Sequence, residues 1–302
     1  MKGLIYAVSA YAMWGCFPLF FSLLSHIDAM QVLSFRIVFA CVFSAALLLL
    51  LGQFGAFRKL WRNRSTLLWS LLASVLISLN WYVFIWAVSQ HRVVETSLGY
   101  FITPLVSLFL GRVLLKESIN HWQFAAGAIA LAAILFELIA LGGVPWVSLV
   151  LAFSFGFYGL VRKIQPIDSL FGLTMETLWV LPLALLFLAG VAQQGQLQHD
   201  LPSWVLLVLS GVVTAIPLLF FAASVRALNL VVAGFIMYLN PLMQFMTAVW
   251  ILEEAVPSQR YVTFVMVWIA MACFITGLVR KQAELRRVKR AMSAELAADS
   301  AK

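Results

Sequence analysis

The chain contains ten apolar segments long enough to cross the hydrocarbon core of a membrane. About 20 apolar residues span a core ~30 Å thick. Hydrophobic residues make up 64% of the 302 residues and charged residues only 11%, which is more apolar surface than a soluble core needs. The sequence therefore predicts an all-α polytopic membrane protein. Its ten transmembrane helices are expected at about 3–24, 31–51, 66–88, 93–114, 121–141, 145–161, 171–192, 203–224, 229–251 and 260–279.

Basic side chains gather on one side of these segments. If the N-terminus is cytoplasmic, all but three of the 20 Lys and Arg residues fall in cytoplasmic loops or in the C-terminal tail. The exceptions are Arg36, within a segment, and Arg92 and Arg260, on the outer side. Because cytoplasmic loops carry an excess of Lys and Arg, we expect both termini in the cytoplasm. The same distribution explains the net charge of +8 without a nucleic-acid partner.

Two stretches of the chain repeat each other at an offset of 137 residues. Residues 80–117 align with residues 217–254, which places Pro104 on Pro241 and Phe101 on Tyr238. Each half of the chain holds five segments, so equivalent helices would cross the membrane in opposite directions. The sequence thus predicts an inverted repeat, which is typical of secondary transporters. The two repeats are expected at 1–141 and 145–280.

The C-terminal tail, residues 281–302, is basic. Apolar residues at helical spacing could form an amphipathic helix on the anionic inner leaflet. The alternative is a solvated and partly disordered segment that only anchors the topology.

Arg36 is the charged residue expected deepest on the outer side of the bundle. A charge within a membrane is unfavourable unless it is paired or faces water, so Arg36 is a candidate functional residue. Glu95, near the outer end of its helix, is the expected partner, and the pair would close the outer side of a pathway. The alternatives are a static ion pair, or an Arg36 side chain that extends to the lipid headgroups.

Glu176 is the counterpart of Arg36 in the second half, near the cytoplasmic side. Basic residues at the same level are Arg162, Lys163 and Arg226, and a pair with one of them would close the inner side. Glu176 could instead be a protonatable coupling site, or part of a packing salt bridge. Glu137, near the outer end of its helix, is expected to be structural.

Pro104 and Pro241 are expected to kink their helices and to free backbone carbonyls near the middle of the membrane. Tyr100 and Thr103 project from one side of the first kinked helix, and Tyr238 lies on the second. These residues could line an aromatic cavity for an organic solute. The alternative is helix packing through small residues.

Three further residues are candidates for the cavity. The Asn80 amide must be satisfied by a neighbouring helix or by a substrate, while Trp14 and Trp81 could line the cavity or pack in the core. The sequence contains no nucleotide-binding or catalytic motif such as Walker A, HExxH or GxSxG. We therefore expect no enzyme activity, no cofactor and no metal site.

These residues together make the chain resemble the drug/metabolite transporter superfamily, and within it the EamA-type transporters of the RarD group. The stretches that carry the resemblance are 10–15, 35–38, 80–88, 95–105, 152–163 and 176–179. The resemblance implies two five-helix EamA repeats in a bacterial inner membrane. It also implies a central cavity lined mainly by helices 1–4 and 6–9, with helices 5 and 10 peripheral.

The chain departs from this group at the cavity. Relatives tend to have His where this chain has Phe35, and Asn where it has Thr103. Here Asn240 precedes the second proline instead. The resemblance therefore leaves room for a different substrate selectivity.

The sequence predicts a secondary-active transporter that exports a small organic metabolite or amphiphilic drug by alternating access. Its energy source would be a proton or solute gradient, or facilitated exchange. The alternatives are an uptake permease of the same fold and a lipid-handling membrane protein that does not transport. Its partners would be the substrate and the lipid bilayer, and the chain is expected as a monomer or homodimer.

Overall fold

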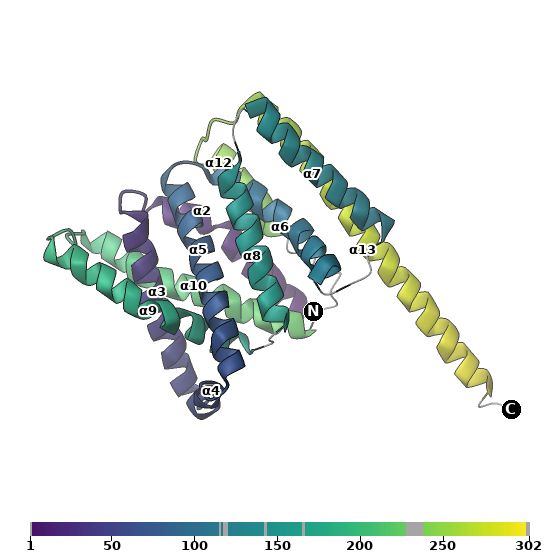
Figure 1. The fold of residues 1–302 in the computed structure, drawn as a ribbon, viewed down its shortest axis with the longest axis horizontal. Helices are drawn as coiled ribbons and strands as arrows, with labels where there is room; N and C mark the ends of the chain where they lie inside the picture. The colour runs from purple at the N-terminus through teal and green to yellow at the C-terminus, as the bar shows by residue number, and fades with distance from the viewer. Residues whose placement is uncertain are drawn as a thin grey trace.

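The computed structural model describes residues 2–114, 116, 120–141, 144–164, 167–227 and 238–299. These residues fold into a bundle of α-helices (Figure 1). The helices are α1 (Lys2–Gly15), α2 (Phe17–Ser22), α3 (Ala29–Leu50), α4 (Phe54–Leu60), α5 (Arg64–Ser89), α6 (Val93–Leu114), α7 (His121–Leu141), α8 (Trp146–Ile164), α9 (Ser169–Gln193), α10 (Leu201–Ala227), α12 (Leu239–Trp250) and α13 (Ser258–Asp299).

The described helices have the length and composition of membrane spans. Among the described residues, eight helices are long and apolar enough to cross a membrane, and Trp146–Arg162 forms a shorter apolar helix. Large apolar side chains such as Leu50 and Ile139 are exposed on the outside of the bundle. This is the architecture of a polytopic helical membrane protein. The span expected at 229–251 lies partly outside the described residues.

Two aspartates fix the starts of α3 and α9. The Asp28 carboxylate accepts hydrogen bonds from Met30 N and Gln31 N at the start of α3. The Asp168 carboxylate accepts one from Leu170 N at the start of α9. An N-terminal cap of this kind satisfies backbone donors that have no partner within the helix. Both helices therefore begin two residues before their expected starts.

The first expected helix, 3–24, is divided in the structure. α1 ends at Gly15, Cys16 forms a turn, and α2 begins at Phe17. Pro18 explains the break, because a proline has no N–H to donate and its ring clashes with the carbonyl one turn earlier. At the second position of α2 it lies where a helix does not need that donor. The span expected at 3–24 is nevertheless present as one apolar segment, Gly3–Ser22, that contains this turn.

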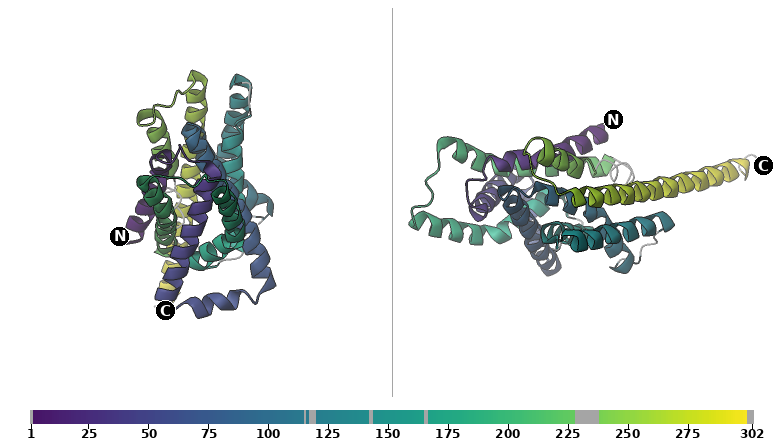
Figure 2. Two further views of the ribbon diagram at one scale, coloured as in Figure 1. Left: turned by 90° about the vertical axis from the view of Figure 1, so that its left-hand side faces the viewer. Right: turned by 90° about the horizontal axis from the view of Figure 1, so that it is seen from above.

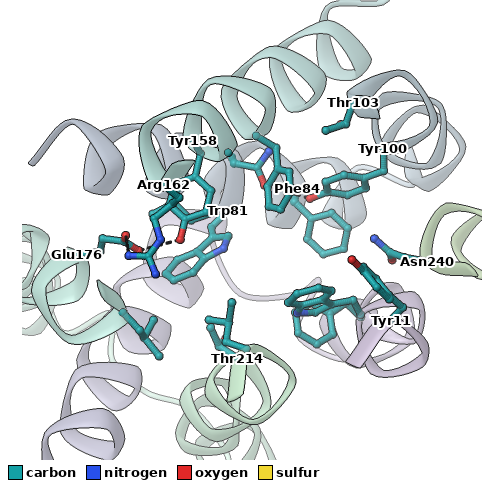
Figure 3. Close-up of a pocket in the computed structure, with 18 of the residues that line it drawn as sticks. Tyr11, Trp81, Phe84, Tyr100, Thr103, Tyr158, Arg162, Glu176, Thr214 and Asn240 are labelled. Atoms are coloured by element: carbon teal, nitrogen blue, oxygen red, sulfur yellow. Dashed lines mark hydrogen bonds and ion pairs between the residues drawn. The ribbon is translucent and has the colours of Figure 1, made fainter. Parts of the chain in front are cut away.

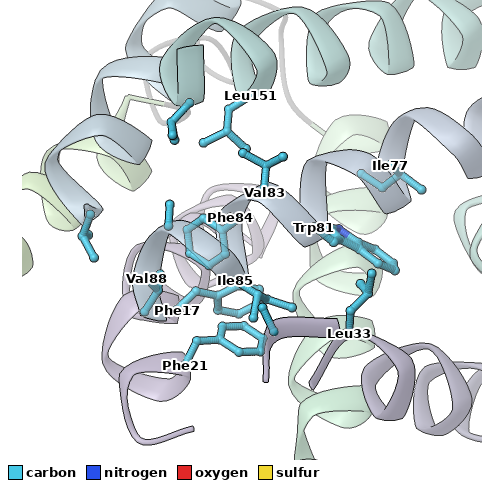
Figure 4. Packing of buried hydrophobic residues seen from close by; sticks show 14 of the residues in the cluster. Phe17, Phe21, Leu33, Ile77, Trp81, Val83, Phe84, Ile85, Val88 and Leu151 are labelled. Atoms are coloured by element: carbon cyan, nitrogen blue, oxygen red, sulfur yellow. The ribbon is translucent and has the colours of Figure 1, made fainter. Parts of the chain in front are cut away.

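The core of the bundle is apolar and aromatic. Phe17 and Phe21 of α2 pack with Phe84 and Ile85 of α5 in one buried cluster (Figure 4). Around this cluster, α3 packs on α9 and α10, α1 packs on α10 and α12, and α8 packs on α5 and α6. α7 and α13 pack against each other at the side of the bundle (Figure 1).

The basic tail continues the last helix. α13 runs without interruption from Ser258 to Asp299, well past the expected end of the span at residue 279. Its C-terminal part projects beyond the rest of the bundle, as seen from above in Figure 2. Residues 281–299 of the tail are therefore helical, as a direct continuation of the last span.

Candidate substrate cavity and its charged ends

A cavity of about 300 Å³ lies inside the bundle. Its lining comes from α1, α2, α3, α5, α6, α8, α9, α10 and α12, while α7 and α13 supply none of the described lining residues. This arrangement agrees with the peripheral position that the resemblance implies for helices 5 and 10. Of the predicted site residues, the cavity is lined by Trp14, Arg36, Asn80, Trp81, Tyr100, Thr103, Glu176, Asn240 and Pro241; Glu95, Pro104 and Tyr238 are outside the lining.

Arg36 lies about two turns into α3 and is 2% exposed. Its Nε donates a 2.7 Å hydrogen bond to Thr214 Oγ1 on α10. The Thr214 hydroxyl in turn donates to the Ser210 carbonyl, so its oxygen is free to accept from Arg36. The guanidinium carbon lies 4.4 Å from the ring centre of Trp81 and 5.0 Å from that of Phe21. Hydrogen bonding and cation–π contacts thus hold Arg36 at the cavity wall.

The predicted ion pair between Arg36 and Glu95 is wrong. Glu95 binds Arg92 through two hydrogen bonds of 2.8 and 2.9 Å, and lies 3.7 Å from the Nη1 atom of Arg260. Since Arg36 is almost fully buried, its extension to the lipid headgroups is contradicted as well.

Arg260 joins Glu95 to a second buried carboxylate. Its Nε donates to Glu137 Oε1 at 2.9 Å, and the Thr263 hydroxyl donates to Glu137 Oε2 at 2.6 Å. Glu137 is 1% exposed, so it reaches neither headgroups nor solvent, and it links α7 to α13. We call Arg92, Glu95, Glu137 and Arg260 the Glu95 cluster.

The start of α6 is held by a carboxylate from another part of the chain. Glu254 accepts hydrogen bonds from Val93 N at 2.5 Å and from Val94 N at 2.8 Å. Backbone N–H groups at a helix start lack partners within the helix and attract negative charge. Glu254 therefore fixes α6 beside the Glu95 cluster. Glu117, its counterpart in the repeat, lies outside the described residues.

Glu176 has the cationic neighbour that was expected of it. Arg162 Nη1 lies 3.4 Å from Glu176 Oε1, and the Tyr158 hydroxyl donates to Glu176 Oε2 at 3.2 Å (Figure 3). Glu176 is 3% exposed and lines the cavity with both partners. We call Tyr158, Arg162 and Glu176 the Glu176 cluster.

The two clusters lie at different levels of the bundle, and α8 runs from one to the other. Near its start, the Ser148 hydroxyl donates to the Glu95 carbonyl, while Arg162 near its end faces Glu176. These positions are 14 residues apart, or about 21 Å at 1.5 Å per residue. The cavity reaches the Glu176 cluster, and no member of the Glu95 cluster is among its described lining residues.

Asn80 is satisfied by neighbouring helices. Its Nδ2 donates to the Leu151 carbonyl at 3.1 Å and to Ser154 Oγ at 3.0 Å, both on α8. Its Oδ1 accepts from the Tyr100 hydroxyl of α6 at 3.1 Å. Asn80 thus joins three helices at the cavity wall and holds the Tyr100 ring in place.

The helices that carry the two prolines contact each other. Ser97 of α6 donates to the Pro241 carbonyl at 2.7 Å, and the rings of Phe101 and Tyr238 stack with centres 6.3 Å apart. Pro104 lies inside α6, as expected, whereas Pro241 lies in the first turn of α12 as described. The residues before α12 are outside the described ranges, so the structure does not test a kink there.

Several cavity residues were not predicted from the sequence. Thr214, Gln244 and Tyr11 line the cavity, and Gln244 accepts from the Thr96 hydroxyl and donates to Asn240. No sequence spacing relates Thr214 to Arg36, because helices distant along the chain bring them together. The Glu95 cluster did leave a signal, since Arg92 and Arg260 were the two cations assigned to the same level as Glu95 and Glu137.

Comparisons with known proteins point to one family. Residues 1–139 match the model of the EamA-like transporter family. Protein RarD of Salmonella typhimurium is 37% identical over 93% of this chain and 97% of its own length. The uncharacterized transporter YojE of Bacillus subtilis is 39% identical over 92% and 95%. The chloramphenicol-sensitive protein RarD of Pseudomonas aeruginosa is 32% identical over 93% and 97%.

A solved crystal structure shares the fold. It covers 90% of this chain and 96% of its own, with a TM-score of 0.61 at 13% sequence identity. At this identity the likeness concerns the fold alone. The matches to named relatives extend over nearly the whole chain and include the second half, which the family model does not reach. The chain belongs to the EamA family of the drug/metabolite transporter superfamily, in its RarD-like group.

Proposed function

We propose that this membrane transporter is a secondary-active exporter that moves a small organic metabolite or amphiphilic drug by alternating access. The observation that carries the proposal is the cavity, which is enclosed by helices from both halves of the chain and lies between two charged clusters. Pockets of about 300–1,000 Å³ suit small organic ligands, and this one lies at the lower end of that range.

The ten-helix inverted repeat is part of the same proposal, and the helix packing supports it. In the proposed repeat, α1 corresponds to α8, α5 to α10, and α6 to α12. The α1–α10 contact then corresponds to the α8–α5 contact, and the α1–α12 contact to the α8–α6 contact. All four contacts are present. Glycines at two of these contacts strengthen the parallel. A side chain at Gly15 would meet Met243, and one at Gly156 would meet Val106, the counterpart of Met243 at the offset of 137.

The two clusters are the proposed closures of the pathway. The Glu95 cluster seals the end that the cavity does not reach, which is the outer end in the proposed topology with both termini in the cytoplasm. The Glu176–Arg162 pair then lies at the cytoplasmic mouth and would break and re-form in each cycle. Each pair gives its end of the bundle two arrangements, closed and open, which alternating access requires.

The two prolines are the proposed hinges. Pro104 follows Thr103 at the cavity wall, and Pro241 lines the cavity itself. A proline weakens the backbone ladder of its helix, because Pro104 has no N–H to donate to the Tyr100 carbonyl one turn earlier. Movement of α6 and α12 about these points would change the width of the cavity.

Flux across proteoliposomes tests the proposal. The purified chain is reconstituted and supplied with labelled amino acids, nucleosides and chloramphenicol-like drugs, with and without an imposed pH gradient. We expect saturable flux of one class, which is driven by the gradient if protons are coupled. Flux towards the side that carries the termini would indicate an uptake permease. No flux of any compound by correctly folded protein would contradict transport and favour a lipid-handling role.

Glu176→Gln tests the role of the Glu176 cluster. The substitution keeps the shape of the side chain and removes its charge, so the attraction to Arg162 is lost while the hydrogen bond from Tyr158 can persist. We expect at least a tenfold lower transport rate with folded protein in the membrane. Lys59→Gln on the exposed face of α4 is the matched control and should transport normally. Wild-type transport rates for Glu176→Gln would contradict the proposal that the Glu176–Arg162 pair closes one end of the pathway.

A further inference from the structure

Arg36 is a buried cation without a carboxylate partner. No described carboxylate lies within ion-pair distance of it, and its Nη1 is buried without a hydrogen-bond partner. A charge removed from water needs a partner to offset its desolvation. The contacts to Thr214 and Trp81 orient the guanidinium, but neither group carries a negative charge.

The charges of the described cavity wall do not balance. Among the lining residues that the structure describes, the charged ones are Arg36, Arg162 and Glu176, which leaves a formal excess of one positive charge. Glu176 is engaged by Arg162 and Tyr158, so Arg162 is the cation that is already compensated. Arg36 is the cation that remains, and it lies against the aromatic part of the wall.

We propose that the substrate carries a single carboxylate that binds the Arg36 guanidinium, with an aromatic or otherwise apolar body in the rest of the cavity. This inference rests on the proposed transport function and names the substrate class. One excess charge matches a monoanion, whereas a phosphate dianion would need a second cation. Eight of the 22 described lining residues are aromatic, and together with Ile77, Leu173 and Leu218 they provide the surface for the body.

One nitrogen of the Arg36 guanidinium, Nη1, has no hydrogen-bond partner although it is buried. Nε is used by Thr214, whereas the bond-free Nη1 belongs to a residue of the cavity wall. Trp81 and Thr214, the two groups that fix Arg36, both lie at the cavity in Figure 3. A carboxylate at this point would supply the missing hydrogen bond and the missing charge together.

Equilibrium binding to the purified full chain in lipid nanodiscs tests this inference without requiring transport. The probes are three aromatic carboxylates of increasing size, benzoate, 3-phenylpropanoate and 1-naphthylacetate, each beside its neutral amide. Quenching of tryptophan fluorescence is the readout, since Trp14 and Trp81 line the cavity, and empty nanodiscs correct for partition into lipid. We expect at least one carboxylate to bind about tenfold more tightly than its amide, which is about 1.4 kcal/mol.

Variants assign this preference to Arg36. In Arg36→Gln the carboxylate and its amide should bind equally, while Lys59→Gln should keep the wild-type ratio. Arg36→Lys should retain part of the preference, because a point charge replaces the planar fork. If Arg36→Gln does not fold, Thr214→Val gives the second test, since it frees the guanidinium to turn and should reduce the ratio without weakening the amide.

The inference and the transport proposal can fail separately. The proposed carboxylate site would be contradicted if the wild-type protein bound every carboxylate and its amide equally, or bound none of them. An unchanged ratio in Arg36→Gln, or tighter binding of phenyl phosphate than of all three carboxylates, would contradict it as well. Saturable flux of a neutral compound with no carboxylate preference would leave the transport proposal intact, whereas carboxylate binding without flux would support Arg36 and contradict transport.

Discussion

At the scale of single residues, the Glu95 cluster shows how a buried carboxylate depends on one cation. Glu137 is 1% exposed and pairs with Arg260 among the described residues, whereas the Arg92 side chain is 32% exposed. Loss of one partner of a buried pair costs about 3–5 kcal/mol, and loss of an exposed one about 0–1 kcal/mol. We expect Arg260→Ala to lower the thermal midpoint in detergent far more than Arg92→Ala.

A second substitution separates charge from packing. In Arg260→Ala, the further change Glu137→Gln removes the uncompensated charge but keeps the acceptor for Thr263. It should restore part of the lost stability, and a double-mutant cycle measures this coupling. Additive effects of the two substitutions, or equal losses for Arg260→Ala and Arg92→Ala, would show that the pair does not stabilise the fold in this way.

At the scale of residues, prediction from sequence worked where a signal specifies the level in the membrane. Glu176 lies beside Arg162, one of the cations expected at its level. The prediction failed for Arg36, because a sequence gives depth but not the direction in which a side chain points. Two charges at one level, Arg36 and Glu95, can face different neighbours, and here they do.

At the scale of elements, close helix approaches depend on glycine. A Cβ at Gly211 of α10 would clash with the backbone of α3 at Phe39 and Ala40, and backbone atoms cannot yield as a flexible side chain can. Overpacking of a tight contact costs about 1–3 kcal/mol, so Gly211→Ala should separate α3 from α10 and lower the thermal midpoint.

Gly190 provides the matched control for Gly211. It lies inside α9, and a Cβ there would meet nothing within 4 Å. Since alanine favours a helix over glycine by about 0.5–1 kcal/mol, Gly190→Ala should be neutral or stabilising. Similar effects of the two substitutions on the thermal midpoint would contradict the close α3–α10 contact.

The helices themselves were largely readable from apolar length, because a membrane requires long apolar segments. The break at Cys16 was not predicted, although Pro18 offered a local signal within the first apolar segment. The continuation of α13 through the basic tail was left open, because a few apolar residues at helical spacing within a basic segment fit a solvated segment equally well. The sequence repeat predicted that the segments of α6 and α12 correspond to each other, but it did not predict that they are in contact. The structure shows that these helices touch.

At the scale of the whole molecule, the cavity is asymmetric, and this asymmetry predicts how the two ends respond to a chemical probe. Ser169 lines the cavity near the Glu176 cluster and is half-buried, whereas Thr96 is fully buried between the Glu95 cluster and the cavity. In a background without Cys16, Cys41 and Cys273, each position is replaced by cysteine and exposed to a membrane-impermeant thiol reagent. Ser169→Cys should react from the side of the termini, and Thr96→Cys from neither side.

Opening of the sealed end should make the Thr96→Cys variant reactive to the thiol reagent. Glu95→Gln removes the charge that holds Arg92 and Arg260, so the closed arrangement loses stability relative to the open one, and the population shifts towards opening. We expect Thr96→Cys to become reactive from the side opposite the termini, with slower labelling of Ser169→Cys in the same protein. This reciprocal change distinguishes alternating access from a local loosening, in which Thr96→Cys would react faster while Ser169→Cys stayed unchanged. Labelling of both positions from the same side would contradict the proposed topology itself, because α6 and α9 would then present both ends of the cavity to one compartment.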